Sequence, residues 1–301
     1  MVLPGGLVIS ARPRLRQPCL LCGISGWVDG GEAATGTVEY LIEKLGARDL
    51  AEIPIDRFHI FQVPGQVSMR PYIRIEDGLI KDHEVPENRF FYWRNRRAAR
   101  DLILFKGSEP NMNWPEFIDA ILHIVRSFSV SVIYLLGGVL DRVPHTREPN
   151  VSCSCSLPAL KREMRAYGVS FGSYEGPGRF GSSLLYRCSQ DGIPMVSLTA
   201  RATYYPEHNI FIQRNPKVIR ALLRRLNTML QLQQDLSDLD GEVRRFEGRL
   251  NRMVARDQEF VDYLARLEAD YVELPYHEPL ELSGDEAVRI AEELLRADRE
   301  E

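Results

Sequence analysis

The chain has 301 residues, of which 44% are hydrophobic and 27% charged, a composition typical of a soluble globular protein. Its formal net charge of −4 lacks the basic excess of nucleic-acid-binding proteins, so we expect no nucleic-acid partner. No stretch approaches the ~20 apolar residues of a membrane span, and the first residues lack a secretory pattern. We therefore expect a cytoplasmic protein with no membrane partner.

The cysteine pattern predicts free thiols and neither a disulfide framework nor a metal site. The sequence holds five cysteines, an odd number. Cys19 and Cys22 have CxxC spacing, but they fall in an expected strand and would point to opposite faces. Cys153 and Cys155 would share one strand face without a histidine or cysteine close by in the sequence. No metal and no cofactor are expected.

The N-terminal third opens, after a poorly specified arm of about twelve residues, with a strand, a turn and a helix. The strand is expected over residues 17–25, the glycine turn over 26–31 and the helix over 32–45. Gly46 stands where a helix commonly ends. The apolar side chains of one helical face are Ala34, Val38, Leu41, Ile42 and Leu45.

The middle of the chain continues to alternate strands and helices. Strands are expected over 51–63, 101–105, 131–136 and 194–200, hairpin arms over 69–76 and 78–85, an aromatic strand or loop over 89–93, helices from 114 and over 158–167, and a glycine-rich loop over 172–181. This alternation predicts an α/β fold with a mainly parallel sheet and helices on both faces.

The C-terminal part has a heptad repeat of apolar residues as regular as that of a coiled coil. It follows a predicted helix start at Asn215-Pro216. Its core positions are Met229, Leu232, Leu236, Leu239, Val243, Phe246, Leu250, Met253, Asp257, Phe260, Leu264, Leu267 and Tyr271. We favour two or three helices folded together, with a break near Ser237–Asp240, Gly241 or Gly248; the alternative is one rod joining subunits. Asp257 either sets the register or ends the coil, and we favour an end.

Two domains are expected, a core over residues 1–235 and a helical region over 236–301. A short last helix is predicted to begin at a capping box, Ser283–Glu286.

The segment 131–156 contains the most promising candidate site. Its strand is expected to end at Gly137-Gly138 and to lead into a loop with Arg142, His145 and Arg147. Ligands of α/β sheets collect where strands end, and the turn 26–31 should lie at the same edge. The candidate ligand or partner residues are Trp27, Asp29, Gly30, Gly137, Gly138, Arg142, His145 and Arg147.

Each of these residues also has a structural interpretation. His145 is either a general base or phosphate contact, or a loop-fixing hydrogen-bond partner; no nucleophile or orienting group is visible in the sequence. Asp29 either caps a helix or binds a ligand. Trp27 is a pocket wall, a partner contact or a core residue. The glycines match neither GxGxxG nor a P-loop, so a nucleoside triphosphate is not expected.

Three segments resemble motifs of the proteasome assembly chaperone family, specifically its bacterial members. Residues 26–34 resemble the family's GWxDAGxAA, residues 61–63 and 86–92 its FQVRRP and PENRFYY, and residues 136–149 its LGGxxxxVPHTRPP. Gly30-Gly31 and Arg147-Glu148-Pro149 depart from Ala-Gly and Arg-Pro-Pro. The similarity spans about residues 17–270 and implies a three-layer α/β/α fold like that of nucleoside phosphorylases and related hydrolases.

The resemblance implies a protein-binding, chaperone-like module with no established catalysis. The candidate partners are proteasome subunits or another protein. We also expect self-association, as a homotrimer, because leucine dominates the a positions of the heptad and the d positions are mixed. The a positions are Met229, Leu236, Val243, Leu250, Asp257, Leu264 and Tyr271. The alternative is an enzyme or nucleoside-like binder of the phosphorylase or hydrolase type that uses the Gly137–His145 loop.

Overall fold

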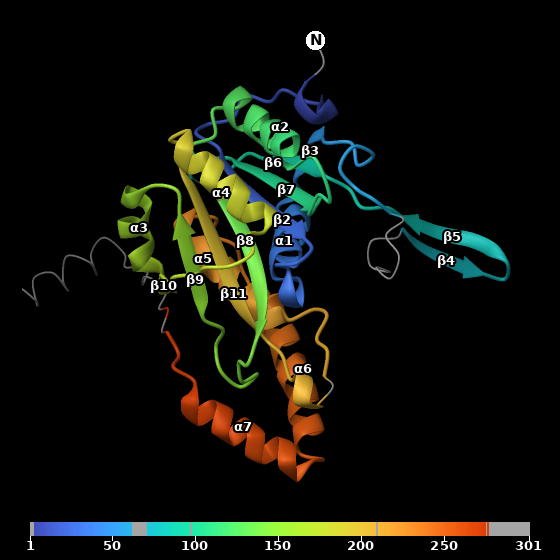
Figure 1. Ribbon diagram of the computed structural model, residues 1–301, viewed down its shortest axis with the longest axis vertical. Coiled ribbons are helices and arrows are strands. Elements are labelled where there is room, and N and C mark those ends of the chain that lie inside the picture. The colour runs from blue at the N-terminus through green and yellow to red at the C-terminus, as the bar shows by residue number, and fades with distance from the viewer. Residues whose placement is uncertain (1–2, 62–70, 97, 209, 275, 277–301) are drawn as a thin grey trace, which may run out of the picture.

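The computed structural model describes residues 3–61, 71–96, 98–208, 210–274 and 276. Within them, nine strands form one sheet in the order β1-β3-β6-β7-β2-β8-β11-β9-β10 (Figure 1). The strands of this sheet are β1 (Val8–Ile9), β2 (Cys19–Ser25), β3 (Arg48–Glu52), β6 (Arg89–Trp93), β7 (Leu102–Ser108), β8 (Val132–Asp141), β9 (Val151–Cys155), β10 (Val169–Ser170) and β11 (Met195–Thr203). The predicted α/β class is confirmed.

Helices cover both faces of this sheet and extend beyond one of its ends (Figure 1). They are α1 (Ala33–Leu45), α2 (Trp114–Ser127), α3 (Pro158–Met164), α4 (Phe180–Gln190), α5 (Pro216–Met229), α6 (Ser237–Val254) and α7 (Gln258–Asp270), with 3-10 turns η1 (Pro4–Gly6), η2 (Gly30–Glu32), η4 (Arg165–Tyr167) and η5 (Pro206–His208). Helices α2 and α4 cover one face, and α1 and α5 cover the other (Figure 1).

The sheet is mixed, with a parallel centre. Strands β7, β2, β8 and β11 run parallel to their neighbours in this group. Beyond β7, strands β6, β3 and β1 are each antiparallel to the strand before them, and β9 is antiparallel to β11. The carboxyl ends of the four central strands therefore share one edge, which is the geometry expected of a ligand-binding α/β sheet.

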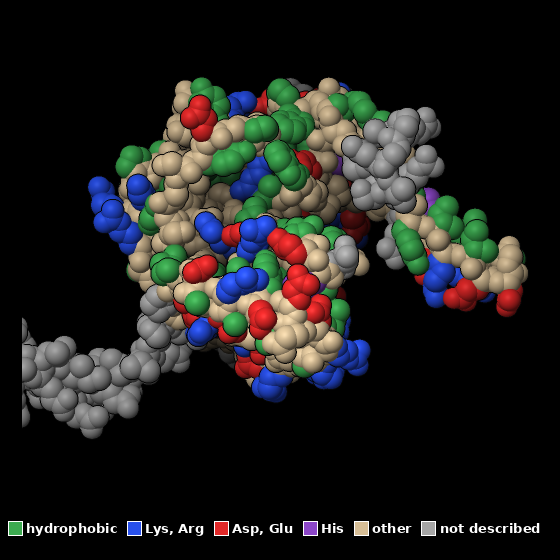
Figure 2. All heavy atoms as spheres, turned by 60° about the horizontal axis from the view of Figure 1, so that its bottom comes forward, with side chains coloured by type: hydrophobic (Ala, Val, Ile, Leu, Met, Phe, Trp, Pro, Cys, Tyr) green, Lys and Arg blue, Asp and Glu red, His purple; other side chains and the backbone are tan. Residues whose placement is uncertain are grey.

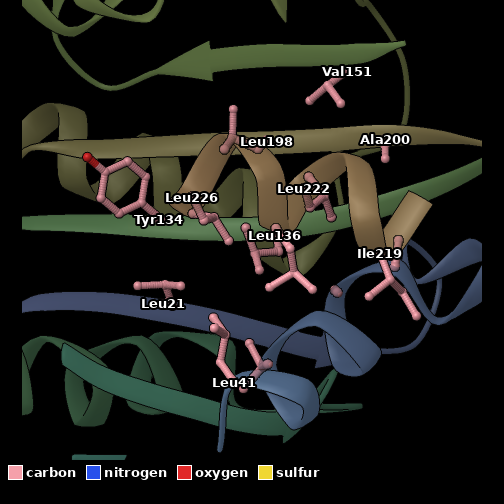
Figure 3. Packing of buried hydrophobic residues seen from close by; sticks show 14 of the residues in the cluster. Leu21, Leu41, Tyr134, Leu136, Val151, Leu198, Ala200, Ile219, Leu222 and Leu226 are labelled. Carbon is pink, nitrogen blue, oxygen red and sulfur yellow. The ribbon is translucent and has the colours of Figure 1, made fainter. Parts of the chain in front are cut away.

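The two faces of β2 belong to two different hydrophobic cores, as strand alternation requires. Cys19 and Leu21 pack with α1 and α5, whereas Leu20 and Cys22 pack with α2 and α4. Figure 3 shows the first of these cores, in which Leu41 and Leu222 meet the sheet from α1 and α5. The opposite orientation predicted for Cys19 and Cys22 is confirmed, and all five cysteines are free.

Several predicted boundaries are wrong. Strand β8 does not end at Gly137-Gly138 but continues to Asp141, paired with β11 as far as Thr203. The strand expected over 51–63 is the shorter β3, with its end at Glu52. Helix α4, which begins at Phe180, was not predicted because its serines and glycine weaken the apolar pattern. The N-terminal arm contains η1 and β1.

The heptad folds back on the protein as separate helices, so the single rod is wrong. Helix α5 ends at Met229, and α6 and α7 follow. Gly241 and Gly248 lie inside α6 and break nothing. Asp257 ends the pattern, as favoured, because its side chain accepts the amide hydrogens of Glu259 and Phe260 and caps α7.

A two-stranded hairpin, β4 (Tyr72–Glu76) and β5 (Leu79–Glu84), projects from the body (Figure 1). It confirms the predicted hairpin over the residues that the structure describes; residues 62–70 of the preceding segment, which include part of one family motif, lie outside them. The helix predicted from Ser283 also lies outside the described residues. No helix among the described residues is long and apolar enough to cross a membrane.

Candidate functional site

The two glycine-containing segments expected at one sheet edge lie against each other. The Gly138 amide donates a 3.0 Å hydrogen bond to the Val28 carbonyl, and Asp29 forms an isolated bridge with Gly138. A Cβ on Gly138 would lie 2.3 Å from the Gly30 carbonyl oxygen, and one on Gly30 would lie 3.0 Å from the Leu140 amide nitrogen. These glycines therefore permit backbone to approach backbone.

Asp29 caps the first turn of α1. One carboxylate oxygen accepts the Ala34 and Thr35 amide hydrogens at 2.7 and 3.2 Å, and the other accepts the Thr35 hydroxyl. Burial raises the pKa of Asp29 to about 6 despite these hydrogen bonds. The hydrogen bonds of the carboxylate all go to the helix that follows it. Helix capping is one of the two roles expected for Asp29 from the sequence.

Trp27 is 65% exposed and forms a wall of a hollow at the ends of β2 and β7. Its amide donates to one oxygen of Glu109 at 3.0 Å, and the other oxygen of Glu109 accepts the Phe180 amide at 2.9 Å. Glu109 thus ties the Trp27 turn to the start of α4. The hollow measures about 760 Å³ and is also lined by Ser25, His59, Phe61, Ser108 and Trp114.

A second hollow adjoins the first. It measures about 670 Å³, and both hollows are lined by Ser25, Pro86 and Ser108. The Ser25 hydroxyl donates to the Ser108 hydroxyl at 3.1 Å between them. Lys106 lies in the second hollow and pairs with Glu39 at 2.6 Å. The carboxyl edge of the sheet is therefore hollowed on both sides of this serine pair, with aromatic side chains on the Trp27 side and charged side chains on the Lys106 side.

Sequence reasoning missed Arg179, which lies beside Gly137. Its guanidinium donates to the hydroxyls of Ser197 and Thr199 at 3.0 and 3.3 Å, and burial lowers its pKa. A Cβ on Gly137 would lie 2.9 Å from an Arg179 nitrogen, so this glycine leaves room for the guanidinium. Glu109 was missed too, although its place just past the end of β7 was a visible signal.

His145 is fully buried in a polar network away from these hollows. Its amide and Nδ1 both contact the Tyr205 hydroxyl at 2.8 Å, and Nε2 contacts the Asn251 side-chain oxygen at 3.0 Å. Its carbonyl accepts from Lys217, which pairs with Glu247 at 2.6 Å. Burial lowers the pKa of His145. These contacts fasten the loop to α5 and α6.

The predicted site residues therefore divide into two groups. Trp27, Asp29, Gly30, Gly137 and Gly138 lie together at the sheet edge, and Arg142, His145 and Arg147 lie in the loop after β8. Arg142 pairs with Glu207 at 2.6 Å on the surface, and Arg147 is exposed. The structure does not assemble His145 and Asp29 into one acid–base pair, because each is held by other partners. Among the described residues, no three histidine, cysteine or acidic side chains are grouped to hold a metal ion.

Comparison with known proteins connects this architecture to one family. The sequence profile of the PAC2 family matches residues 23–254. No curated protein matches the sequence. Among solved structures, a proteasome-assembly chaperone homologue of Mycobacterium tuberculosis is 30% identical over 82% of this chain and 99% of its own, with a TM-score of 0.70. A PAC2 family protein of Streptomyces avermitilis is 28% identical over 81% of this chain and 99% of its own, with a TM-score of 0.69.

An archaeal protein shares the fold at lower identity. A proteasome activator of Pyrococcus furiosus is 22% identical over 82% of this chain and 97% of its own, with a TM-score of 0.62. The similarity at this identity concerns the fold alone.

Proposed function

Because the chain belongs to the PAC2 family, we propose that it is a protein-binding, chaperone-like module that acts as a homo-oligomer in the cytoplasm. The relatives described as a proteasome-assembly chaperone homologue and a proteasome activator make proteasome subunits the proposed partners. The observation that carries the proposal is the apolar face of the β4–β5 hairpin.

Strand alternation separates the hairpin side chains into two faces. Ile73 and Ile75 share one face with Ile80, the cross-strand partner of Ile75, and these side chains are 48%, 62% and 67% exposed. On the other face, Arg74 pairs with Asp82 at 2.6 Å and with Glu76 at 3.0 Å. Figure 2 shows the hydrophobic side chains along one side of the hairpin and the charged ones along the other.

The exposed isoleucines favour a protein partner on energetic grounds. An isolated two-stranded hairpin is at best marginally stable in water, and this one projects away from both cores (Figure 1). Fully burying one such side chain contributes about 1.5–3 kcal/mol. Covering the three isoleucines therefore stabilises both the hairpin and the complex that covers it.

We propose that another copy of the chain covers the hairpin in a trimer. The test is sedimentation of the full chain and of a variant with Ile73→Thr, Ile75→Thr and Ile80→Thr, which keeps β-branched residues in the strands. The wild type should sediment with the mass of three chains and the variant with a smaller mass. Tyr186→Ser removes an equally exposed aromatic side chain from α4 and should leave the mass unchanged. Two results would contradict self-association through the hairpin: a wild type that sediments as a monomer, and a triple variant that sediments with the same mass as an oligomeric wild type.

The chaperone role has a separate test. The tagged full chain, recovered from its native cell, should bring proteasome subunits with it, in contrast to a tagged unrelated protein. Failure to recover these subunits, while the oligomer forms normally, would contradict the partner and leave self-association standing.

A small-molecule site is the second candidate, and the hollow beside Trp27 favours it. Its position at the strand ends is where α/β proteins bind ligands, and the similarity to nucleoside phosphorylases that the sequence led us to expect makes nucleosides the first probes. The Gly137–His145 loop is a poor choice for this role because His145 is buried. Titration with nucleosides should quench the fluorescence of Trp27 and Trp114 in the wild type and quench less in Trp27→Leu, in which only Trp114 still lines the hollow. An unchanged wild-type spectrum would contradict nucleoside binding there.

A further inference from the structure

Cys153 and Cys155 present a pair of sulphur atoms on one face of β9. Both side chains belong to the core on the face of the sheet that α1 and α5 cover, Cys153 buried and Cys155 at its border. Their Sγ atoms are 3.6 Å apart. The sequence spacing predicted a shared strand face, and the structure adds that the two sulphurs are in contact.

Among the described strands, β9 is paired on one side only at this pair of cysteines. Cys153 and Cys155 lie opposite Leu198 and Val196 of β11, whereas β10, on the other side, pairs only with Val151 and Ser152. Residues two apart in a strand have Cα atoms about 6.6 Å apart, near the upper end of the ~4.4–6.8 Å range for disulfides. A disulfide also needs the two β-carbons within about 3.5–4.5 Å of each other, so its formation requires β9 to pucker at Ser154, on the side that β10 does not pair.

The two thiols differ in pKa and in accessibility, and these differences assign them separate roles in a reaction. The hydrogen bond between the two sulphurs lowers the pKa of Cys155, and the nearby Lys161 cation lowers it further. The same hydrogen bond and burial raise the pKa of Cys153. The more accessible Cys155 is thus the better nucleophile, because the thiolate is the reactive form.

We propose that Cys153 and Cys155 are a redox site that forms a reversible disulfide within β9 when the protein reacts with a hydroperoxide. A bond between residues at the upper limit of separation is strained, and strained disulfides are the more easily reduced ones. The site therefore cycles between dithiol and disulfide.

The reaction balances in two steps. The Cys155 thiolate attacks the outer oxygen of the hydroperoxide, the O–O bond breaks, and the alcohol or water leaves with the proton, which produces a sulfenic acid. Cys153 then attacks the Cys155 sulphur, the S–O bond breaks, a second water leaves with the Cys153 proton, and the S–S bond forms. Two thiols are oxidised by two electrons, and the peroxide is reduced.

The test is peptide mass after treatment of the folded full chain with hydrogen peroxide. Trypsin releases residues 148–161, which contain this pair and no other cysteine. In the wild type this peptide should lose two hydrogen atoms, about 2 Da, and regain them with dithiothreitol. Cys153→Ser should stop at the sulfenic acid and form a dimedone adduct on Cys155. Cys155→Ser should lose the remaining thiol at least about tenfold more slowly than the wild type loses its pair.

Three outcomes would overturn the proposal: a wild-type peptide that keeps both thiols, a Cys153→Ser protein that yields no dimedone adduct on Cys155, and a Cys155→Ser protein oxidised as fast as the wild type. Serine is close to cysteine in size, and a near-ultraviolet circular dichroism spectrum that matches the wild type verifies the fold of each variant. The wild-type mass change tests the disulfide even where a variant fails to fold.

Discussion

At the scale of single residues, the His145 ring is held by two partners from distant parts of the chain. Its ring partners, Tyr205 and Asn251, are 60 and 106 residues away in the sequence. The Tyr205 oxygen accepts the His145 amide hydrogen, so its own hydrogen is free to bond Nδ1, and Nε2–H then donates to Asn251. This arrangement assigns a neutral imidazole ring to His145. The sequence could not predict these partners because they are distant, whereas the Asp29 cap was predictable because its partners are five and six residues away.

Replacing His145 with alanine should destabilise the fold. The change opens a cavity and leaves Tyr205 and Asn251 without their ring partner, which together should lower the free energy of unfolding by about 2–4 kcal/mol. Urea denaturation measures it. Arg147→Ala alters an exposed side chain of the same loop and should stay within about 0.5 kcal/mol of the wild type. Equal effects of the two changes would contradict the anchoring role.

The same ring should make stability depend on pH. The folded state lowers the pKa of His145, so the unfolded chain binds the proton more readily. Stability from the neutral ring is complete above about pH 6.5, the unperturbed histidine value, and declines as the pH falls toward the lowered folded pKa. Lys217 opposes the charged ring, while Glu247 and Glu268 favour it. Unfolding free energies at pH 7.5 and 5 should differ more for wild type than for His145→Gln; parallel curves would refute the assignment.

Asp29 should respond in the opposite direction. Its folded pKa of about 6 lies above the ordinary value of 3.8, so its charge opposes folding above pH 6 and protonation relieves this cost as the pH falls from 6 toward 4. Asp29→Asn keeps an oxygen for the Ala34 and Thr35 amides and should preserve stability at pH 7. Asp29→Ala loses the cap and should cost about 1–2 kcal/mol. Thermal unfolding compares them, and equal losses in both variants would contradict the capping role.

At the scale of elements, the sequence correctly predicted the helices and strands that are defined by residues close together in the chain. Helix α1 and the hairpin follow their predicted limits closely, since periodicity, Gly46 and the turn at Gly78 define them. The end of β8 was misplaced because Gly137-Gly138 resembles a strand terminus. Their true role is close approach: η2 crosses Gly138, and Arg179 occupies the space beside Gly137. Contacts between distant segments of this kind have no signal in one sequence.

Gly138 should therefore tolerate no side chain. In Gly138→Ala the new Cβ would meet the Gly30 backbone oxygen at 2.3 Å and the Ala33 Cβ at 2.6 Å, and backbone cannot rotate away as a flexible side chain can. We expect a loss of about 1–3 kcal/mol or more in the free energy of unfolding by urea. Gly172→Ala adds the same methyl group where nothing lies within 4 Å, so it should be close to neutral. A stable Gly138→Ala protein would contradict the close packing of η2 on β8.

At the scale of the whole molecule, the C-terminal helices raise the question whether the chain folds as one domain or as two. Leu239 of α6 belongs to the same hydrophobic core as Leu232, so side chains on both sides of residue 235 share one cluster. Phe246 and Leu250 pack with Ile212 in a smaller cluster. The division into residues 1–235 and 236–301 stays a proposal, and its test is limited proteolysis. Cleavage between α5 and α6 that leaves a stable core of about 235 residues would support two domains.

The proposed trimer also has a consequence for the kind of interface it uses. In a ring of three, each hairpin meets a different surface of the next copy, because only two-fold contacts join identical patches. The triple isoleucine-to-threonine chain then lacks the inserting face but keeps the receiving surface. A tagged variant mixed with untagged wild type should consequently retain wild type on an affinity column, although the variant alone does not self-associate. Retention that fails for a correctly folded variant would contradict a ring and favour a contact in which both hairpins pair with each other.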